Sequence, residues 1–182
     1  DMDNNGIELE LGYHKRFGDF NLDVKGNISH VKNEVIYLGD DKDYIDGDTF
    51  QASDYAINRT AVGQSFSSFY GFKTKGIFQT QEEIDNYKNS EGKVIQPNAK
   101  PGDFRFEDMN DDGNISGEDR TFLGNTIPTW FYGLTVNMTY KNWDLSIFGQ
   151  GSGGNKIFQG LRRLDIPTAN YSAKALDRWT GE

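Results

Sequence analysis

The sequence predicts an all-β fold built from antiparallel hairpins. Several segments alternate apolar and polar residues for most of their length, which is the pattern of a strand with two different faces. Turns of two residues join neighbouring segments of this kind. The composition agrees, because the 182 residues include 21 Gly and 14% aromatic side chains, which favours strands and turns over helices.

The first hairpin is predicted within residues 1–33. Apolar side chains occupy every second position from Ile7 to Tyr13, and the pattern resumes after the short Gly18-Asp19 turn from Phe20 to Ile28, with Gly26 in the same series; polar residues and Gly12 stand between them. The apolar series consists of Ile7, Leu9, Leu11, Tyr13, Phe20, Leu22, Val24 and Ile28. The short turn makes these two strands antiparallel neighbours.

A second hairpin of the same kind is predicted over residues 130–150. Its two strands are joined by Lys141-Asn142, and polar residues again alternate with the apolar ones. The apolar series consists of Tyr132, Leu134, Val136, Met138, Tyr140, Trp143, Leu145 and Ile147.

Alternation alone fits a soluble sandwich and also an outer-membrane barrel, whose apolar face meets lipid and whose polar face lines the lumen. Two details favour the barrel. Aromatic residues bracket the second hairpin, with Trp130, Phe131 and Tyr132 at its start and Tyr140 and Trp143 at its turn. The two groups are separated by roughly 23 Å for tilted strands, close to the height of the apolar band of such barrels. Short turns and one very long connection also match a barrel.

The connection lengths predict the topology. If both short turns are periplasmic, residues 34–129 form an extracellular excursion and residues 151–182 begin the next external loop. Within the excursion, residues 68–78 alternate like a strand, and Thr80 with Glu83 predicts a capped short helix that continues to about Lys88.

Residues 108–119 match the spacing of a twelve-position calcium loop. The predicted ligands are Asp108, Asn110, Asp112, Asn114 through its carbonyl, Ser116 and Asp119. Gly113 stands at the position of the sharp turn, whereas Asp119 replaces the usual longer Glu, which indicates dockerin-type geometry or weaker binding. The preceding residues, 102–107, alternate like a strand instead of forming a helix, so the loop is predicted to be an EF-hand-like rigid clip for Ca²⁺ and not a sensor. The alternative is an Asn/Asp/Gly-rich turn that binds no metal.

Composition excludes several functions. The net charge of −9 argues against a nucleic-acid partner, and the absence of Cys excludes thiolate sites. No apolar run is long enough for a membrane helix. An enzyme is not expected, because His14 and His30 have no companion ligands and no nucleophile elbow accompanies any serine. The first residues show no signal peptide and the last residues end without a natural cap, so we expect a fragment of a longer chain.

Short sequences along the whole chain resemble the SusC/RagA family of TonB-dependent outer-membrane transporters. They are residues 5–11, 26–29 with 32–35, 68–72 with 76–80, 101–103 leading into the calcium-like loop, 149–151 with Gly154-Asn155, and Arg178-Trp179. The resemblance identifies the chain as a C-terminal barrel fragment of such a protein, which has about 22 barrel strands, an N-terminal plug and a TonB box. This chain carries neither plug nor box.

The resemblance implies uptake of glycan or peptide oligomers through the outer membrane of a Gram-negative bacterium. Its expected partners are a SusD-like surface lipoprotein, outer-membrane lipid, and the TonB system through parts that this chain lacks. Phe69, Tyr70 and Phe72 could stack on sugar rings, although packing within the loop region is the favoured role. The alternative function is a soluble calcium-dependent adhesion or dockerin-like β module, although a dockerin would repeat the calcium loop.

Overall fold

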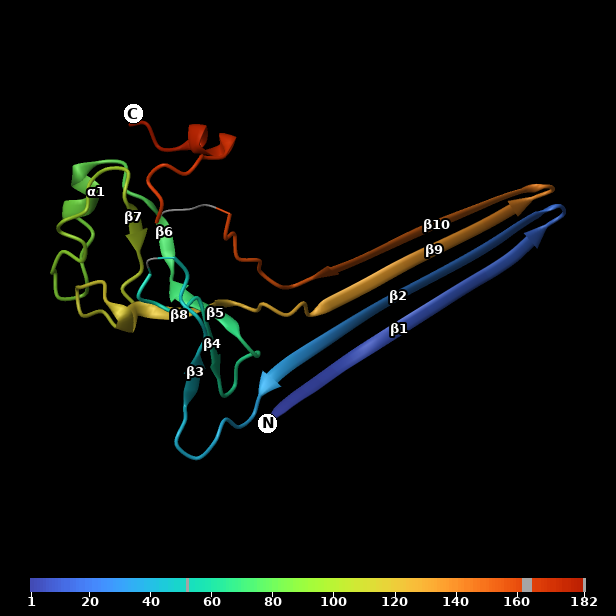
Figure 1. The fold of residues 1–182 in the computed structure, drawn as a ribbon, viewed down its shortest axis with the longest axis horizontal. Coiled ribbons are helices and arrows are strands. Elements are labelled where there is room, and N and C mark those ends of the chain that lie inside the picture. The colour runs from blue at the N-terminus through green and yellow to red at the C-terminus, as the bar shows by residue number, and fades with distance from the viewer. Residues whose placement is uncertain (52, 162–164, 182) are drawn as a thin grey trace. The chain divides into compact units, whose positions relative to one another are not determined.

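The computed structural model describes residues 1–51, 53–161 and 165–181 (Figure 1). Residue 52 of the predicted excursion, and residues 162–164 and 182 of the predicted last loop, lie outside the described residues. The strands are β1 (Met2–Phe17), β2 (Phe20–Val35), β3 (Tyr44–Asp46), β4 (Asn58–Ala61), β5 (Ser68–Phe72), β6 (Thr74–Ile77), β7 (Phe104–Phe106), β8 (Arg120–Gly124), β9 (Trp130–Tyr140) and β10 (Trp143–Gly153). The helical elements are α1 (Gln81–Asp85) and the 3₁₀ turns η1 (Gly117–Asp119) and η2 (Ala173–Asp177). None of the helices in the described residues is long and apolar enough to span a membrane.

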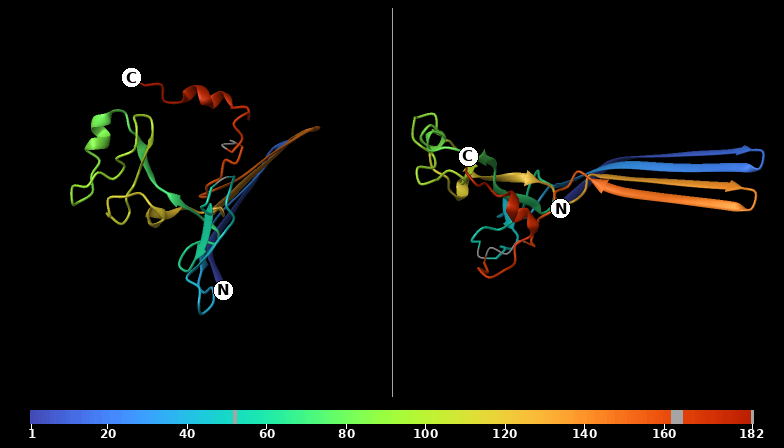
Figure 2. Two further views of the ribbon diagram at one scale, coloured as in Figure 1. Left: turned by 60° about the vertical axis from the view of Figure 1, so that its left-hand side comes forward. Right: turned by 90° about the horizontal axis from the view of Figure 1, so that it is seen from above.

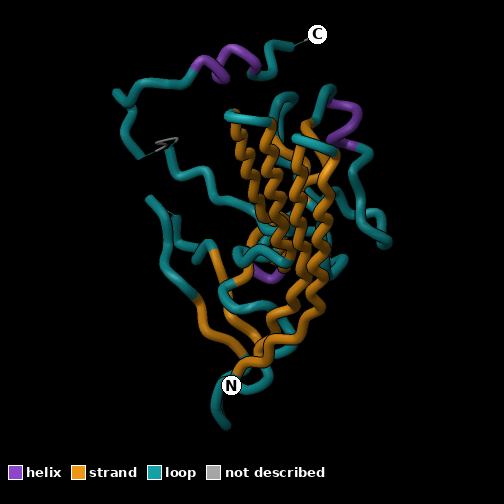
Figure 3. The backbone as a smooth tube through the Cα atoms, turned by 90° about the vertical axis from the view of Figure 1, so that its right-hand side faces the viewer, coloured by secondary structure: helices purple, strands orange, loops and turns teal. Residues whose placement is uncertain are grey.

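The strands form three sheets, and the largest has the order β1-β2-β9-β10. Its four strands run side by side in Figures 2 and 3, with each turn at the same end. β1 pairs with β2 and β9 pairs with β10 as antiparallel hairpins, while β2 also pairs with β9. Both predicted hairpins are therefore present, and their strands continue slightly further than expected, to Val35 and Gly153.

Both hairpin turns have a positive φ at their first residue. Gly18 has a φ of 63° and Lys141 has a φ of 52°, which is the geometry of a turn whose twist matches that of the flanking strands. Glycine adopts this conformation without steric cost, whereas lysine does not, so the second turn is the more strained one.

The chain divides into two compact units. The first contains residues 1–45, 60–68 and 125–157, and the second contains residues 46–59, 69–124 and 158–182. The largest sheet belongs to the first unit. The other sheets have the orders β3-β4-β5-β8 and β6-β7. The predicted strand over residues 68–78 is in fact two strands, β5 and β6, which belong to different sheets.

The second unit contains a small core around α1. Phe78, Ile84 and Ile95 are buried, and the ring of Phe78 lies edge-on to Tyr87 with their centroids 5.8 Å apart. Thr80 caps α1 as predicted, because its hydroxyl accepts a hydrogen bond from the Glu83 amide at 3.2 Å. The helix ends at Asp85, earlier than the predicted Lys88.

The last helical element of the described residues is the 3₁₀ turn η2. η2 ends at Asp177, and the side chain of Ser172, which precedes it, makes no capping hydrogen bond. Beyond η2, the Trp179 indole nitrogen donates to the Gln79 side chain at 3.0 Å.

Candidate functional site

The largest sheet has one continuous apolar face. The register places Tyr13, Val24, Val136 and Ile147 in one row across the four strands. The neighbouring rows are mostly aliphatic, with Lys15 as the one charged residue and two glycines among them; they consist of Lys15, Leu22, Met138 and Leu145 on one side and Leu11, Gly26, Leu134 and Gly149 on the other. Large side chains of this face are exposed: Leu9 is 51% exposed, Leu134 52% and Leu145 53%. The apolar residues therefore do not gather into a dry interior.

An aromatic row crosses this face at the end of the sheet that carries the two turns. Phe17 pairs with Phe20, Phe20 with Tyr140, and Tyr140 with Trp143, so that every strand contributes one ring. The first two rings have their centroids 6.3 Å apart. Near the other end of the same face lie Trp130 and Tyr132. Two aromatic groups thus bracket the apolar face.

The opposite face of the sheet is hydrophilic, and some of its side chains pair across strands. The Asn21 amide donates to the Thr139 hydroxyl at 2.9 Å, and the Ser146 hydroxyl donates to the Asn137 side chain at 2.5 Å. His14 lies 3.5 Å from the Asp23 carboxylate. The alternation predicted from the sequence therefore separates the two faces along most of both hairpins.

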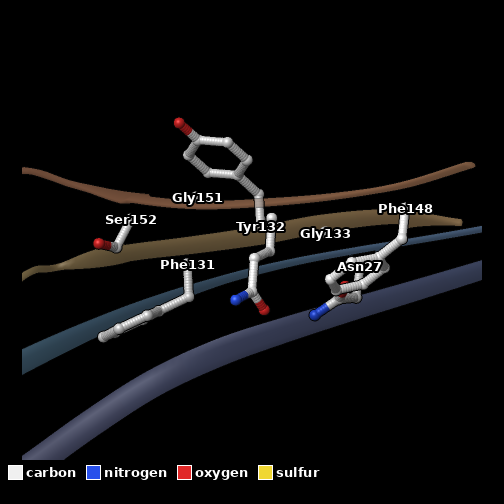
Figure 4. A pocket seen from close by; sticks show the side chains of 8 residues that line it. Asn27, Phe131, Tyr132, Gly133, Phe148, Gly151 and Ser152 are labelled. Atoms are coloured by element: carbon white, nitrogen blue, oxygen red, sulfur yellow. The ribbon is translucent and has the colours of Figure 1, made fainter.

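Phe131 lies on this hydrophilic face and not with the aromatic residues on either side of it in sequence. In Figure 4 its ring and the Phe148 ring lie on one side of the strands, and Tyr132 lies on the other. The sequence analysis had grouped Phe131 with Trp130 and Tyr132. Consecutive strand residues point to opposite faces, so alternation places Phe131 on the face opposite to Trp130 and Tyr132. Phe131 and Phe148 line an open groove of about 540 Å³ together with Asn27, Gly133, Gln150 and Ser152.

The predicted calcium loop lies in the second unit, between β7 and β8. Asp108 accepts hydrogen bonds from the amides of Asp111 at 2.7 Å and Gly113 at 2.8 Å. Asn110 accepts from the Asp112 amide at 3.2 Å, and Asp112 accepts from the Asn114 amide at 2.8 Å. Side-chain oxygens at the first, third and fifth positions of the loop therefore hold its backbone turns.

Asp119, at the last position of the loop, is fully buried. Its two carboxylate oxygens accept hydrogen bonds from the amides of Met109 at 2.9 Å and Ser116 at 2.7 Å, which closes the two ends of the loop on each other. Ser116 caps η1 by accepting from the Glu118 amide at 3.2 Å. β7 and β8 flank the loop, so the prediction that it lacks an entry helix is confirmed.

A neighbouring segment, which sequence reasoning missed, holds the outer side of the loop. The Asn89 amide donates to the Asp111 carbonyl at 3.0 Å, and the Lys93 ammonium donates to the Asp112 carbonyl at 3.0 Å. Ser90 donates to the Asp111 carboxylate through both its hydroxyl and its amide, and these bonds lower the pKa of Asp111 below its ordinary value. In the described part of the chain, no group of three or more Asp, Glu, His or Cys side chains is arranged to hold a metal ion.

The chain is similar along its whole length to known receptors. TonB-dependent receptor P26 of Formosa agariphila is 31% identical over 185 residues, which cover 100% of this chain and 18% of that receptor. TonB-dependent receptor SusC of Bacteroides thetaiotaomicron is 28% identical over 163 residues, which cover 86% of this chain and 14% of SusC. This chain belongs to the SusC/RagA family of TonB-dependent receptors. No family model matches it.

The fold of this SusC/RagA chain agrees with solved structures. The RagAB peptide importer in its open-open state matches with a TM-score of 0.59 and 16% identity, covering 85% of this chain and 15% of that chain. The RagAB peptide transporter gives a TM-score of 0.58 and 15% identity, covering 84% of this chain and 15% of that chain. The chain thus spans less than a fifth of the length of the curated relatives and structures cited here. These relatives are receptors and transporters, which confirms the prediction that the chain is not an enzyme.

Sequence reasoning left two roles open for the aromatic residues of β5, and their contacts within the second unit favour packing. The Tyr70 ring lies 5.0 Å from that of Phe122, and the Arg120 guanidinium lies 4.6 Å from the Tyr70 ring centroid. The Phe72 ring lies 5.5 Å from that of Tyr55. Arg120, which the sequence gave no sign of burying, is 8% exposed and donates to the Tyr70 carbonyl at 3.0 Å.

Proposed function

We propose that this chain supplies two hairpins of the barrel wall, and an extracellular region, to an outer-membrane importer of glycan or peptide oligomers. The observation that carries the proposal is the exposed apolar face of the largest sheet, bracketed by aromatic residues and backed by a hydrophilic face. Similarity to TonB-dependent receptors over the whole chain supports the same function. It also counts against a soluble adhesion or dockerin-like module.

The dimensions of the apolar face suit a bilayer. Eight residue steps separate Tyr132 from Tyr140 on β9, which gives roughly 20 Å along the membrane normal for strands tilted by about 40°. The apolar band of an outer-membrane barrel is about 25 Å high and is flanked by aromatic girdles. In this arrangement the apolar face meets lipid, and the face that carries Asn21, Asp23 and Asn137 lines an aqueous lumen.

The same orientation makes residues 34–129 extracellular and the two short turns periplasmic. The second unit, which contains residues 46–59, 69–124 and 158–182, then lies outside the membrane. Residues 151–182 begin the next external loop. A SusD-like surface lipoprotein is the proposed partner of this region, since the solved relatives include the RagAB peptide importer. Energy from the TonB system would enter through other parts of the full receptor.

We further propose that the loop at residues 108–119 binds Ca²⁺. Support comes from the donor chemistry, because Asp108, Asn110 and Asp112 offer hard oxygen ligands at alternate positions and Asn114 offers a carbonyl. The Asp119 carboxylate and the Ser116 hydroxyl complete the proposed set. An ion held there would stiffen the region between β7 and β8 and fix the shape that a partner lipoprotein contacts.

The proposed topology is tested by labelling single cysteines in the full-length receptor on intact cells. Lys42→Cys lies in the proposed extracellular region and Asp19→Cys lies in the first short turn, and this chain has no cysteine of its own. A membrane-impermeant maleimide is expected to label position 42 on intact cells, and position 19 only after the outer membrane is permeabilised. The unmodified receptor reports any background labelling. Equal labelling of both positions on intact cells would refute the orientation.

A further inference from the structure

Three of the short family-like sequences meet at one place in the second unit. They are residues 76–80, 101–103 and 178–179, and the proposed import function assigns them no role. The contact joins Gln79 and Gly102 to Trp179, which lies 100 residues after Gln79 in sequence. It connects the segment that follows β10 to the excursion of residues 34–129.

Gly102 forms the floor of a slot for the Trp179 ring. Residues 100–103 form a β-turn, in which the Asp103 amide donates to the Lys100 carbonyl at 2.9 Å and Gly102 has a φ of 98°. Proline at the second position and glycine at the third, as in Pro101-Gly102, are typical of a type II turn. A Cβ atom at Gly102 would lie 2.5 Å from Cε3 and 2.9 Å from Cζ3 of Trp179. The six-membered ring of the indole therefore occupies the place that any side chain at position 102 would need.

The core around α1 holds this slot in place. The Gly102 amide donates to the Phe78 carbonyl at 2.8 Å, and the Phe78 amide donates to the Asp103 carbonyl at 3.0 Å. Phe78 is fully buried. The turn that carries Gly102 is therefore fixed by two backbone hydrogen bonds to a buried residue next to Gln79.

Gln79 supplies a hydrogen-bond acceptor whose orientation is set within the same segment. Its side-chain nitrogen donates to the Ile77 carbonyl at 3.1 Å, which leaves its side-chain oxygen for the Trp179 indole nitrogen at 3.0 Å. An indole has one donor and no acceptor, so this single bond satisfies it. Gly102 and Gln79 together form an indole socket, which matches both the ring and the N–H group of Trp179.

Trp179 is the main anchor of the segment in which it lies. Among the described residues 165–181, it is the one large side chain that is not exposed. Tyr171 is 64% exposed and Leu176 is 76% exposed, and η2 contains no buried residue. The segment therefore has no core of its own. Without the indole socket, residues 165–181 would have no large side chain packed against the rest of the second unit.

We propose that the indole socket and Trp179 form a latch that holds residues 165–181 on the excursion. With the latch closed, the two segments move as one body. Undocking transfers one half-buried ring to water and leaves the core around Phe78 intact, so the latch can open without unfolding the second unit. The inference goes beyond the proposed import function and does not depend on it. Under the proposed topology both segments are extracellular, and a partner would meet them as a single surface.

The test measures the rate of trypsin cleavage after Lys174 in the purified full-length receptor. Lys174 lies in η2, and cleavage requires the segment to leave the second unit. The bond after Arg178 is not used, because a substitution of Trp179 changes the sequence that trypsin meets there. Mass spectrometry of the fragments gives the rate at Lys174, and gel migration of unboiled samples verifies that each variant contains a folded barrel.

The variants remove the parts of the latch one at a time. Trp179→Ala should raise the cleavage rate at Lys174 about tenfold, because it removes both the ring and the N–H group. Gln79→Leu removes only the acceptor and should raise the rate about fivefold, although it is distant in sequence from the cleaved bond. Gly102→Ala should also raise the rate, because its Cβ atom collides with the indole.

Two matched controls separate the latch from general loosening. Tyr171→Ala removes an exposed aromatic ring from the same segment. Gly92→Ala places a Cβ atom at a φ of 84° with no atom within 4 Å, so it reproduces the backbone strain of Gly102→Ala without a collision. Both should leave cleavage at Lys174 unchanged. An unchanged rate in either Trp179→Ala or Gln79→Leu would overturn the latch, and so would an equal increase in either control.

Discussion

Arginine in place of Val136 is expected to block assembly of the receptor in the outer membrane. Val136 lies on the apolar face between Val24 and Ile147, with four residue steps separating it from Tyr132 and four from Tyr140. At about 3.4 Å per residue and a tilt of about 40°, it is roughly 10 Å below each aromatic level. In the proposed orientation that depth is the middle of the bilayer, where a charge is most costly.

The size of the effect follows from this depth. An arginine on the lipid face at the bilayer midplane costs about 2–4 kcal/mol, which lowers the ratio of folded to unfolded receptor by about 30- to 700-fold. Asn137→Arg is the matched control, because Asn137 is the next residue on β9 and faces Asp23 across the hydrophilic face. A guanidinium there lies in the proposed lumen beside a carboxylate, and assembly should be nearly unchanged.

The assay follows the full-length receptor in isolated outer membranes and after refolding into phospholipid vesicles. Folded barrel is distinguished from unfolded chain by its faster migration on gels when the sample is not boiled, and urea titration gives the stability difference. Val136→Arg should reduce the folded fraction and Asn137→Arg should not. Equal tolerance of both variants would refute the lipid orientation, and equal damage by both would show that the two faces do not differ in environment.

Two further predictions concern the extracellular region. Removing Ca²⁺ with a chelator should increase protease cleavage within residues 108–119 while both hairpins remain protected. Mass spectrometry of the fragments locates the cleavage sites. The same cleavage with and without chelator would count against the metal. Asp46→Asn should increase hydrogen exchange around β4 at neutral pH, because Arg59 donates to the Asp46 carboxylate at 2.6 and 2.9 Å and lowers its pKa. A lowered folded-state pKa stabilises the fold above the ordinary pKa, and this contribution disappears as the pH falls through the folded-state value, so variant and parent should converge in acid. A difference that persists in acid would assign the effect to packing.

The sequence was sufficient to predict the hairpins and their faces. Alternation assigns Leu9, Val24 and Leu145 to one side of their strands without any knowledge of partners, and short turns fix the neighbours within each hairpin. It was not sufficient to predict that β2 pairs with β9, since pairing between distant strands depends on register that no local pattern encodes. The break between β5 and β6 was missed for a similar reason, because the two halves pair with different strands.

In the loop at residues 108–119, the sequence again predicts the local features and not the contacts from distant segments. Spacing alone located the oxygen side chains, and the hydrogen bonds that Asp108 and Asp119 accept follow from the turns that such spacing requires. The contacts from Asn89, Ser90 and Lys93 could not be predicted, because they come from a segment whose own sequence shows no ligand pattern. Arg120 directly follows the loop, and no sequence pattern shows that its guanidinium is buried against aromatic rings of the second unit.

The distribution of buried residues explains why the apolar face needs a partner outside this chain. Among the described residues, the buried hydrophobic side chains are Val35, Ala56, Phe78, Ile84 and Ile95, and none of them belongs to the central rows of the largest sheet. Val24 and Val136 of the central row are only half-buried, and Tyr13 and Ile147 at its edges are exposed, so the chain itself supplies only part of the burial free energy of these rows. The hydrophilic face cannot cover them, because it lies on the opposite side of the same strands. In the proposed orientation, acyl chains cover the apolar face and the aqueous interior of the barrel meets the hydrophilic face.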